Sequence, residues 1–282
     1  MTDLLQRFLF EQTDIRGELV RLDQSYTDAL SAHDYPETVQ RLLGEFLAAA
    51  ALLSATLKID GSISLQARSN GEVPLIMAEA NSDHCLRGIA RGADEASSTD
   101  FTTLLRDGLL TISIEPRKGR RYQGIVALEG DNLAQCLEAY FRQSEQLETK
   151  LWFCTEAGAA AGMMLQQLPA TATSTAGPDD WEHILQLTNT ITSAELLELE
   201  FNDLLYRLYN QEPIRVFAAT ALRFRCSCSQ ERTLNALTTL GEAECLEIIQ
   251  EQGSIETHCE FCHQHYQFNR DDVTTLFRPP LH

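Results

Sequence analysis

Positive charge is scarce in this sequence. Lysine and arginine together number 22, against 41 aspartate and glutamate residues, so the formal net charge is −19. A protein of this charge repels nucleic-acid phosphates and anionic lipid unless it carries a strong local basic patch. The nearest approach to one is Arg117, Lys118, Arg120 and Arg121, which we interpret as a solvated hairpin loop. We therefore expect neither nucleic acid nor a membrane as a partner.

Long hydrophobic runs are also missing. The most apolar stretch, residues 46–53, is well short of the roughly 20 residues that span a bilayer, and we interpret it as part of a buried helix. Residues 1–7 lack the basic start and the long apolar core of an export signal. We therefore expect a cytoplasmic protein with reduced thiols. In that compartment, closely spaced cysteines indicate metal ligands or redox sensors rather than structural disulfides.

The familiar catalytic motifs are absent as well. The sequence has no glycine-rich nucleotide loop, no Gly-x-Ser-x-Gly nucleophile turn and no His-Glu-x-x-His metal motif. Acidic residues are plentiful, but no two of them stand out as a catalytic pair. We predict that the protein is not an enzyme.

The first 175 residues mix strand and helix patterns. A helix is predicted from Pro36 to about residue 58, and another after Asp131 as its N-cap. The second helix has one apolar face, formed by Leu133, Cys136, Leu137 and Tyr140. Strands are predicted at residues 15–22, 62–68, 73–80, 110–115, 121–128, 150–154 and 163–168. Strands outnumber helices and hairpins join most of them, which favours an α+β body with a largely antiparallel sheet over residues 1–175.

A small, polar segment at residues 171–178 ends in Gly-Pro and predicts a domain boundary. A helical linker is expected over residues 176–222. Its first helix covers residues 181–191, and Thr192 and Glu195 form a capping-box pattern that opens a second. The second helix has an apolar stripe of Leu197, Phe201, Leu204, Leu205 and Leu208. Such short helices must pack on a neighbour, either permanently or as a segment that can be released.

Five of the eight cysteines lie in the last fifth of the chain. They include two close pairs, Cys226-x-Cys228 and Cys259-x-x-Cys262, with 30 residues between Cys228 and Cys259. Facing cysteine pairs commonly present four thiolates to one tetrahedral Zn²⁺, which leaves no open position for a catalytic water. We therefore predict a C-terminal zinc-binding domain at residues 223–282. The intervening segment has helical patterning at Leu234, Leu237, Leu240, Leu246, Ile248 and Ile249.

The other candidate ligands are weaker. Three histidines could compete for the metal, but four cysteines already complete its shell; they are His258, His263 and His265. Cys245 is interpreted as a plain small residue of the intervening segment. The remaining cysteines have apolar neighbours and are predicted to be buried, inert thiols; they are Cys85, Cys136 and Cys154.

Four thiolates on one Zn²⁺ leave a formal charge of −2, so the sulfurs remain targets for peroxide or hypochlorite. Cys226 and Cys228 are close enough to form a disulfide with each other, as are Cys259 and Cys262. Oxidation would remove the ligands and release the metal. Because zinc binding contributes roughly 10–16 kcal/mol to the folding of small zinc sites, its loss would unfold the tail. The alternative, which paired cysteines alone favour, is a redox-inert structural zinc site.

The two cysteine pairs at this spacing, near the end of such a chain, resemble the redox-regulated bacterial 33-kDa chaperonin family. Further stretches agree with that family between about residue 8 and about residue 270. They are RGELV at residues 16–20, HDYP at 33–36, ATLK at 55–58, RGIAR at 87–91, YQGIVALEG at 122–130 and YFRQSEQ at 140–146. The resemblance covers nearly the whole chain, and it raises redox switching above the inert alternative.

The resemblance implies a cytoplasmic holdase chaperone that is inactive when reduced and zinc-bound. Oxidation, helped by heat, forms two disulfides and frees zinc; the tail and linker loosen, and the protein binds unfolding polypeptides, commonly as a homodimer. By motif, the zinc ligands and redox cysteines are Cys226, Cys228, Cys259 and Cys262. Residues 1–175 would then be the client-binding and dimerisation body.

Two other classes remain to be weighed against a holdase. One is a zinc-dependent interaction module that never oxidises. The other is a thiol oxidoreductase, although Cys259-x-x-Cys262 lacks the strand-to-helix setting of a thioredoxin-like motif.

Overall fold

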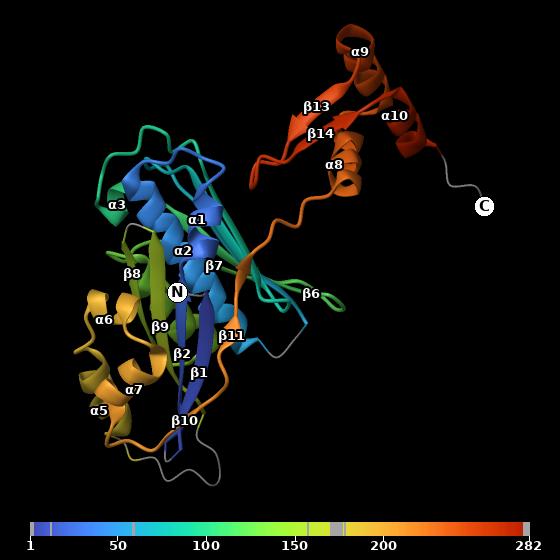
Figure 1. The fold of residues 1–282 in the computed structure, drawn as a ribbon. Helices are drawn as coiled ribbons and strands as arrows, with labels where there is room; N and C mark the ends of the chain where they lie inside the picture. The colour runs from blue at the N-terminus through green and yellow to red at the C-terminus, as the bar shows by residue number, and fades with distance from the viewer. Residues whose placement is uncertain are drawn as a thin grey trace. The chain divides into compact units, whose positions relative to one another are not determined.

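The computed structural model of the chain describes residues 3–11, 13–57, 60–156, 158–169, 177 and 179–278. The chain divides into two compact units, Met1–Arg225 and Cys226–His282. Figure 1 shows the larger unit as two β-sheets with helices packed on them, and the smaller unit as a short hairpin with helices around it.

The first sheet of the larger unit, sheet A, is antiparallel and has the order β10-β1-β2-β9-β8, with β11 also paired to β1. Its strands are β1 (Leu4–Phe10), β2 (Ile15–Leu22), β8 (Thr149–Glu156), β9 (Ala159–Gln167), β10 (Ile214–Val216) and β11 (Thr220–Ala221). Its central strands β2 and β9 are buried along almost their whole length. A strand buried on both faces reads as a continuous apolar run, as the AAAGMML sequence at the start of β9 does.

The second sheet, sheet B, has the order β12-β5-β4-β3-β6-β7. Its strands are β3 (Gly61–Arg68), β4 (Leu75–Asn81), β5 (Cys85–Arg91), β6 (Leu109–Pro116), β7 (Tyr122–Ala127) and β12 (Arg223–Phe224). All neighbours are antiparallel except β12, which runs parallel to β5. The predicted α+β fold with antiparallel sheets is therefore confirmed, although the strands are divided between two sheets.

Helix α2 (Glu37–Thr56) joins the two sheets into one core, because it contacts β2, β8 and β9 of sheet A and β3, β4 and β5 of sheet B. The alanines at 48–51 are fully buried, and their small side chains let both sheets approach closely. By length and composition alone this helix could cross a membrane, but 67% of its most apolar window is buried. It is the buried helix predicted around residues 46–53. The unit also contains α1 (Gln24–Leu30), α3 (Phe101–Leu104) and α4 (Leu133–Tyr140).

The predicted strands and hairpins of the larger unit are confirmed, with shifts of a few residues at their ends. The hairpin loop that carries Arg117 is exposed, as expected, and Arg117 itself forms ion pairs with Asp60 and Asp83. The predicted N-cap of α4 is wrong by one residue. The Asn132 side chain, not that of Asp131, accepts the backbone N–H of Gln135 at 3.0 Å, because Asn132 has the extended conformation that a cap requires.

The linker helices α5 (Asp180–Thr188), α6 (Ser193–Glu198) and α7 (Phe201–Tyr209) pack on the outer face of sheet A. Side chains along each strand of this sheet alternate between its two faces. Leu19 and Met163 pack with the linker helices. Their neighbours Val20 and Met164 pack in the core that contains α2. Sheet A is therefore apolar on both sides. The predicted boundary at residues 171–178 lies outside the described residues except for Gly177.

The predicted second linker helix is in fact two helices, and this prediction is wrong. The capping box of Thr192 and Glu195 is present at the start of α6, but the backbone is extended at Leu199 and α7 begins after Glu200. The break has a clear cause. The guanidinium of Arg21, on β2, donates to the carbonyl oxygens of Leu196 at 2.9 Å and Leu199 at 2.5 Å. These bonds satisfy carbonyls at the end of α6 that would otherwise lack a partner.

Arg21 is 4% exposed, and its guanidinium also lies over the ring of Phe201, at 5.2 Å from the ring centroid. One buried cation of the sheet therefore contacts both halves of the broken helix. A weaker polar contact, from the Cys154 thiol on β8 to the carbonyl of Ser193 at 3.7 Å, also reaches α6, and apolar side chains of the three helices pack on the same face of sheet A.

The smaller unit contains α8 (Gln230–Ala236), α9 (Glu242–Gln252), α10 (Arg270–Phe277) and a hairpin of β13 (Ile255–His258) and β14 (His265–Phe268). Helical structure between the cysteine pairs is confirmed, whereas the hairpin and α10 were not predicted. Between residues 226 and 278, where the structure describes this unit, the buried apolar side chains are few: Leu237, Cys245, Ile249, Ile255, Phe268 and Val273.

The substitution Arg21→Met tests the role of this contact. It keeps an unbranched apolar side chain but removes both hydrogen bonds to the linker. A hydrogen bond from a charged donor contributes roughly 1.5–3 kcal/mol, and one such bond corresponds to a factor of ten or more, so we expect amide hydrogen exchange in α6 and α7 to become at least about tenfold faster. Arg68→Met, on the exposed end of β3, is the matched control. Unchanged exchange in both helices would show that apolar packing alone holds the linker.

Candidate metal centre

The first cysteine pair lies in an extended segment that leads into a helix. Directly after Cys228, the Ser229 side chain caps α8 by accepting the backbone N–H of Arg232 at 3.2 Å. The Arg232 guanidinium donates in turn to the carbonyl of Ser227 at 2.8 Å. Residues two apart on an extended chain point to the same side, so a Cys-x-Cys sequence held in this way presents both sulfurs together.

The second pair lies in the turn of the β13–β14 hairpin. The strands pair up to His258 and His265, and the turn is closed by the N–H of Cys259 donating to Gln264 at 2.9 Å and the N–H of His263 donating to Cys259 at 2.8 Å. His263 has φ of 53°, in the left-handed region that tight turns use. The hairpin thus fixes Cys259 and Cys262 on a rigid turn.

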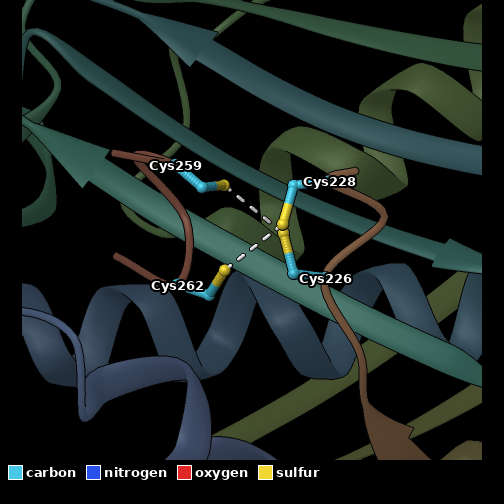
Figure 2. Close-up of side chains that lie close together, drawn as sticks. All are labelled: Cys226, Cys228, Cys259 and Cys262. Carbon is cyan, nitrogen blue, oxygen red and sulfur yellow. Dashed lines mark hydrogen bonds between the residues drawn. The ribbon is translucent and has the colours of Figure 1, made fainter. Parts of the chain in front are cut away.

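Figure 2 shows the four cysteine side chains converging on one point. All four sulfurs lie within 4.8 Å of one another, with 3.6 Å between Cys226 and Cys259 and 3.5 Å between Cys228 and Cys262. A disulfide would need about 2.05 Å, so the thiols are free. Zinc–sulfur bonds of about 2.3 Å in a tetrahedron place the sulfurs about 3.8 Å apart. The donor set and its spacing therefore fit a tetrahedral Zn²⁺.

The surroundings shift the pKa values of the cysteine thiols in different directions. Burial is the main cause that raises the pKa of Cys226 and of Cys262. Burial acts in the same direction on Cys228, but the hydrogen bond from the Tyr266 hydroxyl, with those from the neighbouring thiols, lowers its pKa overall. The Tyr266 oxygen lies 3.1 Å from the Cys228 sulfur. Sequence reasoning missed this residue, although its position four residues after Cys262 in the sequence was a usable signal.

The other predicted candidates lie outside the cluster. His258, His263 and His265 are exposed on the hairpin, and the rings of His258 and His265 lie 4.8 Å apart. Cys245 is fully buried in the small core of this unit, which fits its interpretation as a plain small residue. Among the described residues, the four cysteines are the group of potential ligands close enough to hold one metal ion.

Of the three cysteines in the larger unit, Cys85 and Cys136 are buried as predicted, but Cys154 is only half-buried. That prediction was wrong for Cys154 because β8 is an edge strand of sheet A, with one face on a pocket of about 830 Å³. Burial, and then the charges of Glu156 and Glu45, raise the pKa of Cys154 to about 12. The thiol is therefore protonated at neutral pH and a poor nucleophile.

Comparisons with known proteins agree with this arrangement. The family model for "Hsp33 protein" matches residues 3–269. This chain belongs to the Hsp33 family. An Hsp33-family relative in Pseudomonas aeruginosa strain LESB58, named 33 kDa chaperonin, is 50% identical over 281 residues, covering 98% of this chain and 95% of the relative. A relative of the same name in Azotobacter vinelandii is 49% identical over 280 residues, covering 98% and 94%.

The fold agrees with a solved member of the Hsp33 family. The crystal structure of the 33 kDa chaperonin from Thermotoga maritima superposes with a TM-score of 0.82 and 22% identity, covering 97% of each chain. The resemblance predicted from the sequence is thereby confirmed, and the family is one of chaperones.

Metal content tests the cluster directly. We expect the reduced protein to hold about one Zn²⁺ per chain, as four cysteine ligands would. Cys259→Ser should lose that zinc because a hydroxyl is a poor replacement for a thiolate. Cys245→Ala removes a thiol from the same unit but outside the cluster, and it should keep the metal. Elemental analysis after gel filtration is the measurement; equal zinc in both variants would contradict the assignment.

A second prediction concerns Glu45, a partly buried carboxyl on α2 that lines the same pocket as Cys154. Burial raises the pKa of Glu45 from 4.5 to about 7. A raised carboxyl pKa means that the folded state binds the proton more tightly, so this contribution to stability is present below pH ~4.5 and is lost as the pH rises through ~7.

Glu45→Gln, which cannot ionise, should therefore melt several degrees higher than the native protein at pH 8 and at nearly the same temperature at pH 4.5. Thermal unfolding followed by circular dichroism at both pH values is the measurement. Glu37→Gln, at an exposed carboxyl on the same helix, should show no such pH-dependent gain. An equal gain at both pH values would contradict the assigned pKa.

Proposed function

We propose that this protein is a redox-regulated holdase chaperone, inactive when reduced and zinc-bound, that binds unfolding polypeptides after oxidation. The observation that carries the proposal is the cluster of four free thiols in a unit with a very small apolar core. Membership of a chaperone family supports it. The alternative is a redox-inert, zinc-dependent interaction module.

The proposed zinc ligands are Cys226, Cys228, Cys259 and Cys262, which are also the proposed redox cysteines. When bound, Zn²⁺ would hold the four sulfurs as thiolates and close the loop between the two pairs. The core of six buried apolar side chains among residues 226–278 is small for a domain of this length, and such domains commonly depend on a metal. Loss of the metal would therefore unfold residues 226–282 rather than merely loosen them.

Hydrogen peroxide is a sufficient oxidant for this step. One thiolate attacks a peroxide oxygen, which breaks the O–O bond and gives a sulfenic acid and hydroxide. A second thiolate then attacks the sulfenic sulfur, forms the S–S bond and displaces a second hydroxide; two protons convert the hydroxides to water. Each disulfide therefore consumes one peroxide and two electrons from sulfur. We propose that the pairs are sequence neighbours, Cys226 with Cys228 and Cys259 with Cys262.

The linker supplies the surface that activation would expose. Helices α5–α7 bury Ile184, Leu196, Leu197, Phe201, Leu204, Leu205 and Leu208 against sheet A. The ring of Tyr209 lies 4.9 Å from Phe10 and 6.0 Å from Phe8. Release of these helices would uncover both their own apolar stripe and the outer face of sheet A. An exposed apolar patch of that size is the kind of surface that binds unfolded chains.

The remaining parts of the proposal follow from the family and the composition. Residues 1–175 would form the client-binding and dimerisation body, residues 176–222 the releasable linker and residues 223–282 the switch. The active form would be a homodimer in the cytoplasm, with no nucleic acid or membrane partner. The net charge of −19 would help to keep the exposed apolar surface soluble.

The decisive experiment treats the reduced, zinc-loaded protein with peroxide at elevated temperature. We expect zinc release, loss of four thiols per chain, and suppression of the aggregation of a denatured enzyme by the treated protein alone. Cys154→Ala is the matched control for the half-buried thiol outside the cluster, and it should behave like the native protein. Retained zinc with no effect on aggregation would leave the redox-inert module as the function.

Tryptic mapping of the oxidised protein tests the disulfide pairing. Cleavage at Arg225, Arg232 and Arg270 places Cys226 with Cys228 in one peptide and Cys259 with Cys262 in another. Disulfides between sequence neighbours therefore leave these two peptides separate. Disulfides across the cluster, such as Cys226 with Cys259, would link them and contradict the proposed pairing.

A further inference from the structure

In the smaller unit, the hydroxyl of Tyr266 contacts the cysteine cluster but is neither a proposed zinc ligand nor a proposed redox group. Tyr266 is the second residue of β14 and pairs with Thr257 of β13. Its ring packs against the small core of this unit, while its hydroxyl lies 3.1 Å from the sulfur of Cys228. The hairpin that carries Cys259 and Cys262 thus also carries a hydrogen-bond donor to Cys228, which belongs to the other pair.

The direction of this hydrogen bond follows from the chemistry of the two groups. A thiolate has only lone pairs to offer, so the phenol donates and the sulfur accepts. A bond to an ionised acceptor is stronger than one between neutral groups. For comparison, burial raises the pKa of Cys226 and of Cys262, and the hydrogen bonds that oppose this rise come mainly from the backbone at Cys228 and Gln264. The Cys228 bond differs in coming from a side chain, so one substitution can remove it.

We propose that Tyr266 is a positioning residue that sets how readily the cysteine cluster is oxidised. This inference rests on the proposed redox function and concerns the same site. The hydroxyl holds the Cys228 sulfur in its place in the cluster and draws electron density away from it.

Both effects slow oxidation. Attack on peroxide uses a sulfur lone pair, and the lone-pair density that Tyr266 engages is less available for breaking the O–O bond. Residues that hydrogen-bond to metal ligands also orient them, and their loss commonly weakens metal binding. Without the hydroxyl, Cys228 is a better nucleophile and is less firmly held. The protein then responds to less oxidant.

Tyr266→Phe removes one oxygen atom and keeps the ring that packs in the core. We expect the variant to hold the same amount of zinc when reduced, and to release it about tenfold faster in a fixed concentration of peroxide, a size typical of lost contacts to metal ligands. A chromophoric zinc chelator follows the release. Tyr206→Phe, at an exposed tyrosine of the larger unit, is the matched control and should release zinc at the native rate.

A second measurement separates this role from a merely structural one. In protein loaded with Co²⁺ instead of zinc, the sulfur-to-cobalt charge-transfer band reports the electron density on the thiolates. Loss of a hydrogen bond to one sulfur should move this band to longer wavelength in Tyr266→Phe and not in Tyr206→Phe. A loosened hairpin with unchanged sulfur chemistry would raise zinc loss to the chelator without peroxide and leave the band in place.

The outcomes distinguish this inference from the proposed function. If the native protein releases zinc on oxidation and Tyr266→Phe does so at the same rate with an unmoved band, the role of Tyr266 is wrong and the redox switch stands. If the native protein itself keeps its zinc in peroxide, the proposed function fails, and the cobalt band alone then reports whether Tyr266 acts on the Cys228 sulfur.

Discussion

Sheet A carries apolar side chains on both faces and must therefore be covered twice. Helix α2 covers one face and belongs to the core that joins both sheets. Helices α5, α6 and α7 cover the other. These three helices have 9, 6 and 9 residues, and helices of that length are not stable alone in water. They can be helical only while docked, so the folding of the linker and the covering of sheet A are one equilibrium.

The smaller unit has the opposite difficulty, because it has too little apolar surface to bury. Its centre consists of side chains from α9, α10 and the hairpin, together with Leu237 just after α8. Four sulfurs gather where the start of this unit meets the hairpin turn. In the proposed reduced state, a metal there would do what a larger core does elsewhere. A unit built in this way is stable as a whole or not at all, which is the behaviour that a switch requires.

Much of this architecture can be predicted from the sequence, where local patterns dominate. The long apolar run of α2, the strands predicted at residues 62–68 and 73–80, and the capping box at Thr192 are local signals, and the structure contains all three features. The spacing of the cysteines likewise predicts that their sulfurs meet. The first three signals depend on neighbouring residues only, whereas the two cysteine pairs are recognised together because paired thiolates commonly share one Zn²⁺.

Apart from the one-residue error at the N-cap of α4, the failures share a different cause, since each depends on parts of the chain that are distant in sequence. The break between α6 and α7 is made by Arg21, which lies more than one hundred residues earlier. Cys154 is half-exposed because its strand lies at a sheet edge, which periodicity cannot reveal. The short strands β10, β11 and β12 have little pattern of their own and form because β1 and β5 offer free edges. The bond from Tyr266 to Cys228 likewise requires the hairpin to be in place.

The short strands that follow the linker helices have a consequence for how the proposed switch resets. The chain leaves sheet A at the end of β9 and returns to it at β10, which pairs with β1 of the same sheet. While β10 stays paired, helices freed from the sheet remain a closed loop anchored at both ends. The effective concentration of these helices near the outer face of sheet A then stays high. A bound client therefore competes with helices that are tethered beside the same face. Release of clients can therefore begin as soon as the helices re-form, without a search through solution.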